Sequence, residues 1–181
     1  MTAKRSAGKA DLNPHDALVL LSTDHNEIDK LAREFERHRK TASPVEKGKL
    51  ALRICHALAV HAVIKTEVFY PAADAVLEGE DKEWLGRARV EQDGIRRLIV
   101  KIENMSSEHP SFDSTVLVLA EQASRLMKKE EGELFPRLRH SRLDLVGTGE
   151  RMAARKTQLS TAPLDRRLIR QARKVMGAGN R

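Results

Sequence analysis

Apolar residues recur at intervals of three and four along four long stretches of the chain. This spacing places them on one face of an α-helix, so each stretch is predicted to form an amphipathic helix. The helices are expected at about residues 14–40, 44–70, 83–105 and 111–139. Four helices with short connections and one apolar stripe each pack best as an up-down-up-down antiparallel four-helix bundle. The predicted fold class is therefore all-α.

Local signals indicate where the first two helices begin and where the second ends. Asn13 followed by Pro14 predicts a helix cap with proline in the first helical position. The stretch SPVE at residues 43–46 has the pattern of a capping box with proline after the cap. Pro71 predicts that the second helix ends at Tyr70.

The chain is expected to divide into three parts. Residues 1–12 are predicted to be a flexible basic N-terminus, residues 13–157 the bundle domain, and residues 158–181 a basic C-terminal tail with helical spacing. Within the domain, LDLVGTGERMAARK at residues 143–156 predicts a turn and a short helix that the glycines loosen. Residues 151–181 contain nine Lys and Arg against Asp165 alone, a net charge of +8, so the total of +7 leaves −1 for residues 1–150.

Composition narrows the class of protein. Aromatic residues make up 3% and charged residues 33% of the chain, which favours long amphipathic helices over a β-sandwich or barrel. The single cysteine, Cys55, allows no internal disulfide and fits a reducing compartment. No secretory signal and no apolar run of the roughly 20 residues that span a bilayer are found, so we expect a cytoplasmic protein. No phosphate-cradling glycine loop, nucleophile elbow or paired catalytic carboxylate is present, so we expect no enzymatic activity.

Polar residues interrupt the apolar stripe of every predicted helix near its middle. They are His25, His61 with Lys65, Gln92, and Glu130. Because a buried polar group without a partner costs free energy, we expect these side chains to face one another. Helix bundles build metal and cofactor sites in this position.

Several stretches of the chain resemble the hemerythrin-like HHE cation-binding family over about residues 14–157. They are DHNEIDKL, ICHALAVHAVIKTEVFYPAA, VEQDGIRRLI, KKEEGELFPRL and LDLVGTGERMAARK. The resemblance implies a four-helix bundle with a non-haem iron centre, usually of two irons. It also implies the ligand set: one His on the first helix, His-x-x-x-Glu on the second, one His on the third and His-x-x-x-Glu on the fourth.

The resemblance carries only part of that ligand set onto this chain. His25, His61 and Glu130 match a first-helix histidine, a second-helix histidine and a fourth-helix glutamate. The other three positions are substituted, with Lys65 for glutamate and both Gln92 and Leu126 for histidine. The candidate metal ligands are therefore His25, His61 and Glu130.

Two interpretations of this centre remain open. In the first, Lys65 pairs with Glu130 in place of a metal, and the centre holds no cofactor. In the second, His25, His61 and Glu130 bind one iron or other divalent cation, and Lys65 turns away or loses its proton. A two-iron centre is disfavoured, because it needs bridging carboxylates as well as histidines.

The other reactive side chains are assigned to structural or surface roles. Cys55 is expected to be a small buried packing residue, and His56 to lie on a different helix face from His61. Glu67 and Glu131 fall off the core stripe and are expected to be solvated. Trp84 is expected to plug one end of the bundle. Four histidines near helix ends are expected at the surface: His15, His38, His109 and His140.

Three functional hypotheses follow. The first is a regulatory or partner-binding module, with a degenerate metal-free centre, in the response to oxygen, nitric oxide, oxidative stress or iron. The second is a protein that senses oxygen or nitric oxide, or senses or stores iron, through the remaining ligands. The third is an adaptor whose basic tail binds nucleic acid or an anionic membrane surface by charge. The apolar residues of the tail allow the alternative that it docks on the bundle or on a partner helix.

Overall fold

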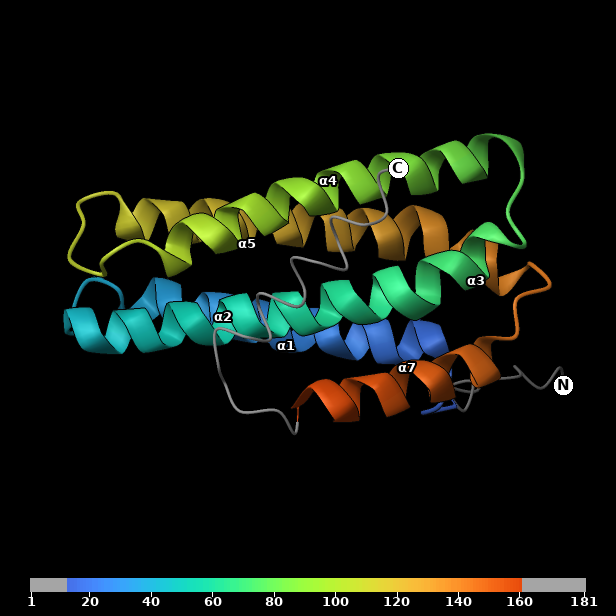
Figure 1. Cartoon of the computed structure of the whole chain (residues 1–181), viewed down its shortest axis with the longest axis horizontal. Helices are drawn as coiled ribbons and strands as arrows, with labels where there is room; N and C mark the ends of the chain where they lie inside the picture. Colours follow the sequence, from blue (N-terminus) through green and yellow to red (C-terminus); the bar gives the residue numbers. More distant parts are fainter. Residues whose placement is uncertain (1–12, 161–181) are drawn as a thin grey trace, which may run out of the picture.

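The predicted all-α bundle is confirmed by the structure, a computed structural model that describes residues 13–160. Four long helices alternate in direction along the molecule (Figure 1): α1 (Ala17–His38), α2 (Pro44–Ile64), α4 (Gly79–Glu103) and α5 (Phe112–Lys129). Two π-helical segments extend α2 and α5, namely η1 (Lys65–Phe69) into α3 (Tyr70–Asp74) and η2 (Glu130–Leu134) into α6 (Phe135–Arg139). A further helix, α7 (Leu145–Ser160), follows.

The helix starts confirm one predicted cap and correct the other. In α2, the Ser43 and Glu46 side chains each bond the backbone N–H of the other residue, as a capping box requires. In α1 the predicted cap at Asn13 is wrong. The N-cap is Asp16, whose carboxylate accepts hydrogen bonds from the backbone N–H groups of Leu18 and Val19, 2.8 and 3.4 Å away.

The predicted end of the second helix at Tyr70 is also wrong, since helical structure continues through Pro71 to Asp74. Proline lacks the N–H that an α-helix bonds four residues back, and its ring clashes with that carbonyl. Here the turn before it is a π turn, in which the Tyr70 N–H bonds the carbonyl of Lys65, five residues earlier. The fourth helix repeats this arrangement with Glu130, Phe135 and Pro136. Both π turns therefore begin at a candidate site residue.

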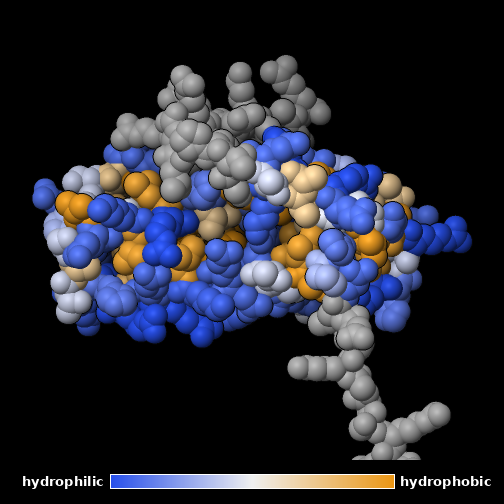
Figure 2. Space-filling view, turned by 90° about the horizontal axis from the view of Figure 1, so that it is seen from below, coloured by the Kyte–Doolittle hydropathy of each residue, from blue (hydrophilic) through white to orange (hydrophobic). Residues whose placement is uncertain are grey.

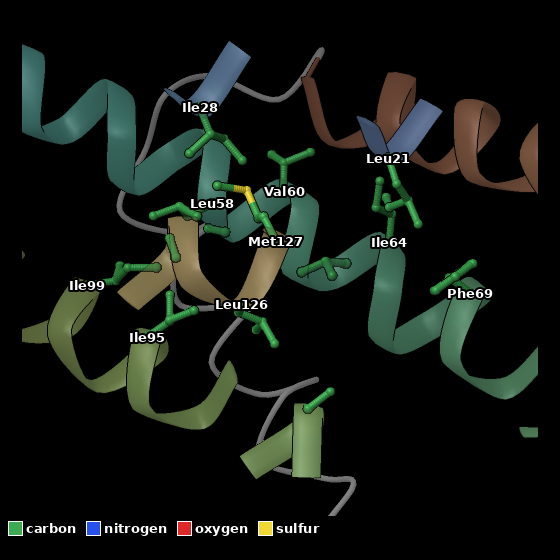
Figure 3. Packing of buried hydrophobic residues seen from close by; sticks show 14 of the residues in the cluster. Leu21, Ile28, Leu58, Val60, Ile64, Phe69, Ile95, Ile99, Leu126 and Met127 are labelled. Atoms are coloured by element: carbon green, nitrogen blue, oxygen red, sulfur yellow. The ribbon is translucent and has the colours of Figure 1, made fainter. Parts of the chain in front are cut away.

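Aliphatic side chains fill the space between the four long helices. Figure 3 shows Leu58 of α2, Ile95 and Ile99 of α4, and Met127 of α5 gathered at one level of this core. Leu21 and Ile28 of α1 join the same cluster. The core thus surrounds the polar side chains at mid-bundle and shields them from water.

Helix α7 covers a second face of α2. Every residue from 58 to 64 is buried, which one bundle-facing stripe cannot explain. Met152 and Leu159 of α7 are buried in the same core cluster. Figure 2 views the molecule from the side on which α7 lies, and its surface is mainly hydrophilic with separate hydrophobic patches. Helix α7 is therefore part of the domain.

The glycines of residues 147–149 do not interrupt α7, contrary to the loosening expected from the sequence. Gly149 instead allows a close approach of two backbones. A Cβ at this position would lie 1.8 Å from the carbonyl oxygen of His15 and 2.8 Å from the backbone nitrogen of Ala17. The absence of a side chain lets α7 pack against the start of α1.

No helix within residues 13–160 is long and apolar enough to cross a membrane. The predicted N-terminal segment, residues 1–12, and most of the predicted basic tail lie outside the described residues, and α7 ends at Ser160 within that tail.

We expect Gly149→Ala to lower the free energy of unfolding by about 1–3 kcal/mol, because α7 must move away from α1. Gly86→Ala is the matched control, since an added Cβ at this exposed position of α4 meets no atom within 4 Å. That change should stabilise the chain by up to about 1 kcal/mol through helix propensity. Urea unfolding followed by circular dichroism measures both. Equal stability of Gly149→Ala and the parent would contradict the packing of α7 described above.

Candidate metal centre

The polar side chains singled out in the sequence lie together inside the bundle. His25 comes from α1, His61 from α2, and Lys65 and Glu130 from the first residues of η1 and η2. All four are buried, with exposed fractions of 4%, 5%, 1% and 0%. Gln92 of α4 is buried as well.

Lys65 and Glu130 form a buried ion pair, as predicted. The Lys65 Nζ atom lies 2.5 Å from Glu130 Oε1 and 5.1 Å from the centre of the Tyr70 ring. The Tyr70 hydroxyl donates to the same Oε1 atom at 3.1 Å. One oxygen of the Glu130 carboxylate is thus held by a cation and a phenol, and the other is left free of both.

The second oxygen of Glu130 lies near His25, with the His25 Nε2 atom 3.5 Å from Oε2. His25, His61 and Glu130 each offer one possible ligand atom, and these three atoms lie within 4.8 Å of one another. The buried atoms His25 Nε2, His61 Nε2 and Glu130 Oε2 have no hydrogen-bond partner among residues 13–160. Buried polar atoms without a partner are rare in folded proteins, so three that converge on one point indicate a ligand site.

A carboxylate lies beside the Nδ1 atom of each histidine ring and orients the ring. His25 Nδ1 is 2.7 Å from Glu131 Oε1, and His61 Nδ1 is 3.4 Å from Asp24 Oδ2. A carboxylate only accepts hydrogen bonds, so Nδ1 of each ring carries the proton. The Nε2 atom of a neutral ring then presents a lone pair. Metal-binding histidines in proteins are oriented in this way.

Burial and neighbouring charge set the protonation of the centre. Burial raises the pKa of Glu130, but the opposing effects, of which the positive charge of Lys65 is the largest, outweigh it and lower that pKa to about 2. Burial lowers the pKa of His61 to about 4, an effect that the hydrogen bond with Asp24 opposes and the charge of Lys65 reinforces. At pH 7 the Glu130 carboxylate is therefore charged and the His61 ring is neutral.

The remaining substituted positions contribute no ligand to this cluster. Gln92 donates to Thr66 Oγ1 at 3.0 Å, and its Oε1 atom lies 3.2 Å from the Tyr70 hydroxyl. Leu126 is buried in the hydrophobic core (Figure 3). The family resemblance implies ligands at six positions. Three of them hold a residue that can bind a metal, and the structure brings these three, His25, His61 and Glu130, together. They come from α1, α2 and the extension of α5.

Two of the side chains expected to be solvated have structural contacts instead. Glu131 is 43% exposed, yet its carboxylate orients His25. Glu67 accepts two hydrogen bonds from Arg155 of α7, at 2.5 and 3.2 Å. Neither acid lies on an apolar stripe, so periodicity could not identify these contacts.

Cys55 and the four histidines near helix ends lie as expected, and Trp84 is buried. Cys55 is fully buried, and burial raises its thiol pKa to about 12. Trp84 is buried and donates to Glu133 at 2.7 Å. His56 is half-buried and is absent from the cluster of candidate ligands. The four histidines near helix ends are exposed: His15, His38, His109 and His140.

Comparison with known proteins agrees with the helical-bundle fold. The family model described as the hemerythrin HHE cation binding domain matches residues 16–138. A solved structure of a hemerythrin HHE cation binding domain-containing protein from Mycobacterium kansasii superposes with a TM-score of 0.68 at 20% identity, covering 86% of this chain and 98% of that one. At this identity the likeness shows the fold alone.

A curated relative, named DNA nickase, comes from Nostoc sp. (strain PCC 7120 / SAG 25.82 / UTEX 2576). It is 27% identical over 138 residues, which are 76% of this chain. The chain spans only 36% of the length of that relative.

We expect Lys65→Met to lower the free energy of unfolding by about 3–5 kcal/mol at pH 7.5, because it leaves the Glu130 carboxylate buried without a cation. The pKa of Glu130 in the parent, about 2, lies below its ordinary value of 4.5. The ionised Glu130 carboxylate therefore makes its full contribution to the free energy of unfolding of the parent above about pH 4.5. That contribution is lost as the pH falls toward 2. In the variant, Glu130 takes up a proton at a higher pH, so the deficit should shrink between pH 7.5 and 5.

Urea unfolding at the two pH values measures this difference. Lys30→Met removes an exposed lysine of α1 and should change stability little. The double change Lys65→Met with Glu130→Gln should recover part of the loss, because no buried carboxylate remains. A Lys65→Met protein as stable as the parent at pH 7.5 would show that the pair contributes nothing.

Proposed function

We propose that this chain, which belongs to the hemerythrin HHE cation-binding family, is a non-catalytic module that binds one divalent cation. The ligands would be His25 Nε2, His61 Nε2 and Glu130 Oε2. The observation that supports this most directly is the convergence of these three buried atoms, none of which has a hydrogen-bond partner among the described residues.

The residues present do not fit a two-metal centre. Such a centre needs further carboxylate and histidine ligands, and Lys65, Gln92 and Leu126 occupy those positions. The ammonium group of Lys65 also lies against Glu130 Oε1, where it repels a second cation. A single cation at Glu130 Oε2 needs none of these further ligands and lies on the side of the carboxylate away from the Lys65 ammonium group.

Two imidazole nitrogens and one carboxylate oxygen suit iron(II), and they also suit zinc. An ion held by three protein ligands keeps open coordination positions, which would supply a binding point for a small ligand. The role that we propose on this basis is sensing of oxygen, nitric oxide or iron.

The metal-free alternative is supported by the short Lys65–Glu130 contact. In that arrangement the two histidine Nε2 atoms stay buried without partners, at a cost of about 1–3 kcal/mol each. A bound water would satisfy them in the same place as an ion. Metal analysis separates these two states.

We expect protein purified without chelator, and then loaded with Fe²⁺ or Zn²⁺, to hold about one ion per chain after gel filtration. Glu130→Gln and His61→Gln should each abolish this binding, because each removes one of three ligands. His56→Gln is the matched control on α2, since His56 is outside the cluster. Inductively coupled plasma mass spectrometry gives the ion count.

A second variant tests the substituted positions. Lys65→Glu, Gln92→His and Leu126→His together restore the ligand pattern of the family and should raise the iron content toward two per chain. A parent that holds no ion would support the metal-free module. A parent that already holds two would show that Lys65 does not replace a cation.

A second candidate function, nucleic-acid binding, is supported by the net charge of +8 on residues 151–181 and by the likeness to the relative named DNA nickase. We expect the chain to bind a DNA duplex in fluorescence anisotropy, with an affinity that falls steeply between 50 and 200 mM salt. Changing four tail arginines to Gln should weaken binding: Arg166, Arg167, Arg170 and Arg173.

The matched control changes four exposed lysines of the bundle to Gln: Lys40, Lys49, Lys101 and Lys128. Equal weakening by both sets would indicate general charge attraction. Binding that neither set alters would exclude a role for the tail.

A further inference from the structure

Helix α7 makes two ion pairs with segments around the centre, one with α1, which carries His25, and one with η1, which begins at Lys65. Lys156 Nζ contacts Asp24 Oδ1, and Asp24 is the residue that orients His61. One residue earlier, Arg155 holds Glu67 in η1, the π turn that begins with Lys65. A helix outside the four-helix bundle thus contacts the surroundings of the centre.

Asp24 depends on Lys156 for its position. Its side chain is 6% exposed, so an unpaired carboxylate there would be costly. The other contact of Asp24, to His61 Nδ1, is long at 3.4 Å and cannot fix the carboxylate alone.

Two hollows of about 390 and 220 Å³ also lie beside the Asp24–Lys156 pair, and both residues line each of them. A carboxylate released by Lys156 therefore has space to turn away from the imidazole and reach water.

We propose that Lys156 is a positioning residue for the cation centre. It holds Asp24 against His61 Nδ1, which keeps the proton on that nitrogen and the Nε2 lone pair directed at His25 and Glu130. The predicted consequence for cation affinity rests on the function proposed above, whereas the consequence for the His61 tautomer does not. Through this contact, displacement of α7 would weaken the centre.

The test compares three full-length variants. Lys156→Met removes the ammonium group and keeps much of the side-chain length, and Lys156→Arg keeps a cation that can reach Asp24. Arg151→Met removes a charge from an exposed position of the same helix, where the side chain donates a hydrogen bond to Thr148. Thermal unfolding verifies that each variant is folded.

The first readout needs no metal. Long-range ¹H–¹⁵N spectra of the metal-free proteins report the imidazole tautomers, and the His61 signals are assigned by their loss in His61→Gln. We expect Nδ1–H in the parent, Lys156→Arg and Arg151→Met, and a mixture with Nε2–H in Lys156→Met. A Lys156→Met protein with the parental tautomer would overturn the proposal.

The second readout is the Zn²⁺ dissociation constant from chelator competition. It should rise about 10–100-fold in Lys156→Met and stay near the parental value in Arg151→Met, as expected for loss of an outer partner of a metal ligand. An unchanged constant in Lys156→Met would refute control of affinity by Lys156. The parent could bind no Zn²⁺ while Lys156→Met still shifts His61 away from the Nδ1–H tautomer. In that case the proposed cation site is wrong and the positioning role of Lys156 stands.

Discussion

The buried pair of Lys65 and Glu130 constrains how the two halves of the bundle meet. Either charge alone in this position would cost several kcal/mol, because neither side chain reaches water. The 2.5 Å contact between these charges therefore favours the arrangement in which the extensions of α2 and α5 lie side by side at this point. The hydroxyl of Tyr70 also contacts the Glu130 carboxylate. The first π turn, η1, supplies Lys65, and the helix that follows it, α3, supplies Tyr70. The other polar contacts of the centre are arranged around this fixed carboxylate.

The helices were predictable from the sequence where local chemistry decides them. Apolar spacing placed all four long helices, and the capping box at Ser43 fixed the start of α2. The prediction failed at Pro71, because a proline normally ends a helix and the π turn that admits it has no periodic signature. It also failed for the glycines of α7. Gly149 is required by the backbone of His15, and a contact between residues so far apart in sequence cannot be recognised from local propensity.

The candidate site was predictable where it lies on the apolar stripes. His25, His61 and Glu130 interrupt those stripes, and the structure brings them together. The acids behind the histidines were not predicted, because Asp24 directly precedes His25 on its helix and Glu131 follows Glu130, off the stripe in each case. Lys156 could not be found at all, since it is separated from Asp24 by 132 positions in the chain. Periodicity identifies residues that face a core, whereas groups that reach inward from its edge depend on tertiary packing.

The charge of Lys65 affects how many divalent cations the centre could hold. The family pattern implies glutamate at position 65, so a lysine there changes the local charge from −1 to +1, an increase of two. One divalent cation carries the same charge. By formal charge, the acidic and basic side chains around the histidines are Lys65 and Lys156 against Glu130, Glu131 and Asp24, which sum to −1. A single divalent ion would bring this sum to +1, and a second would bring it to +3 in a site shielded from water. Under the proposed function, Lys65 thus takes the place of one cation, and the His25–His61–Glu130 side keeps charge and lone pairs for one more.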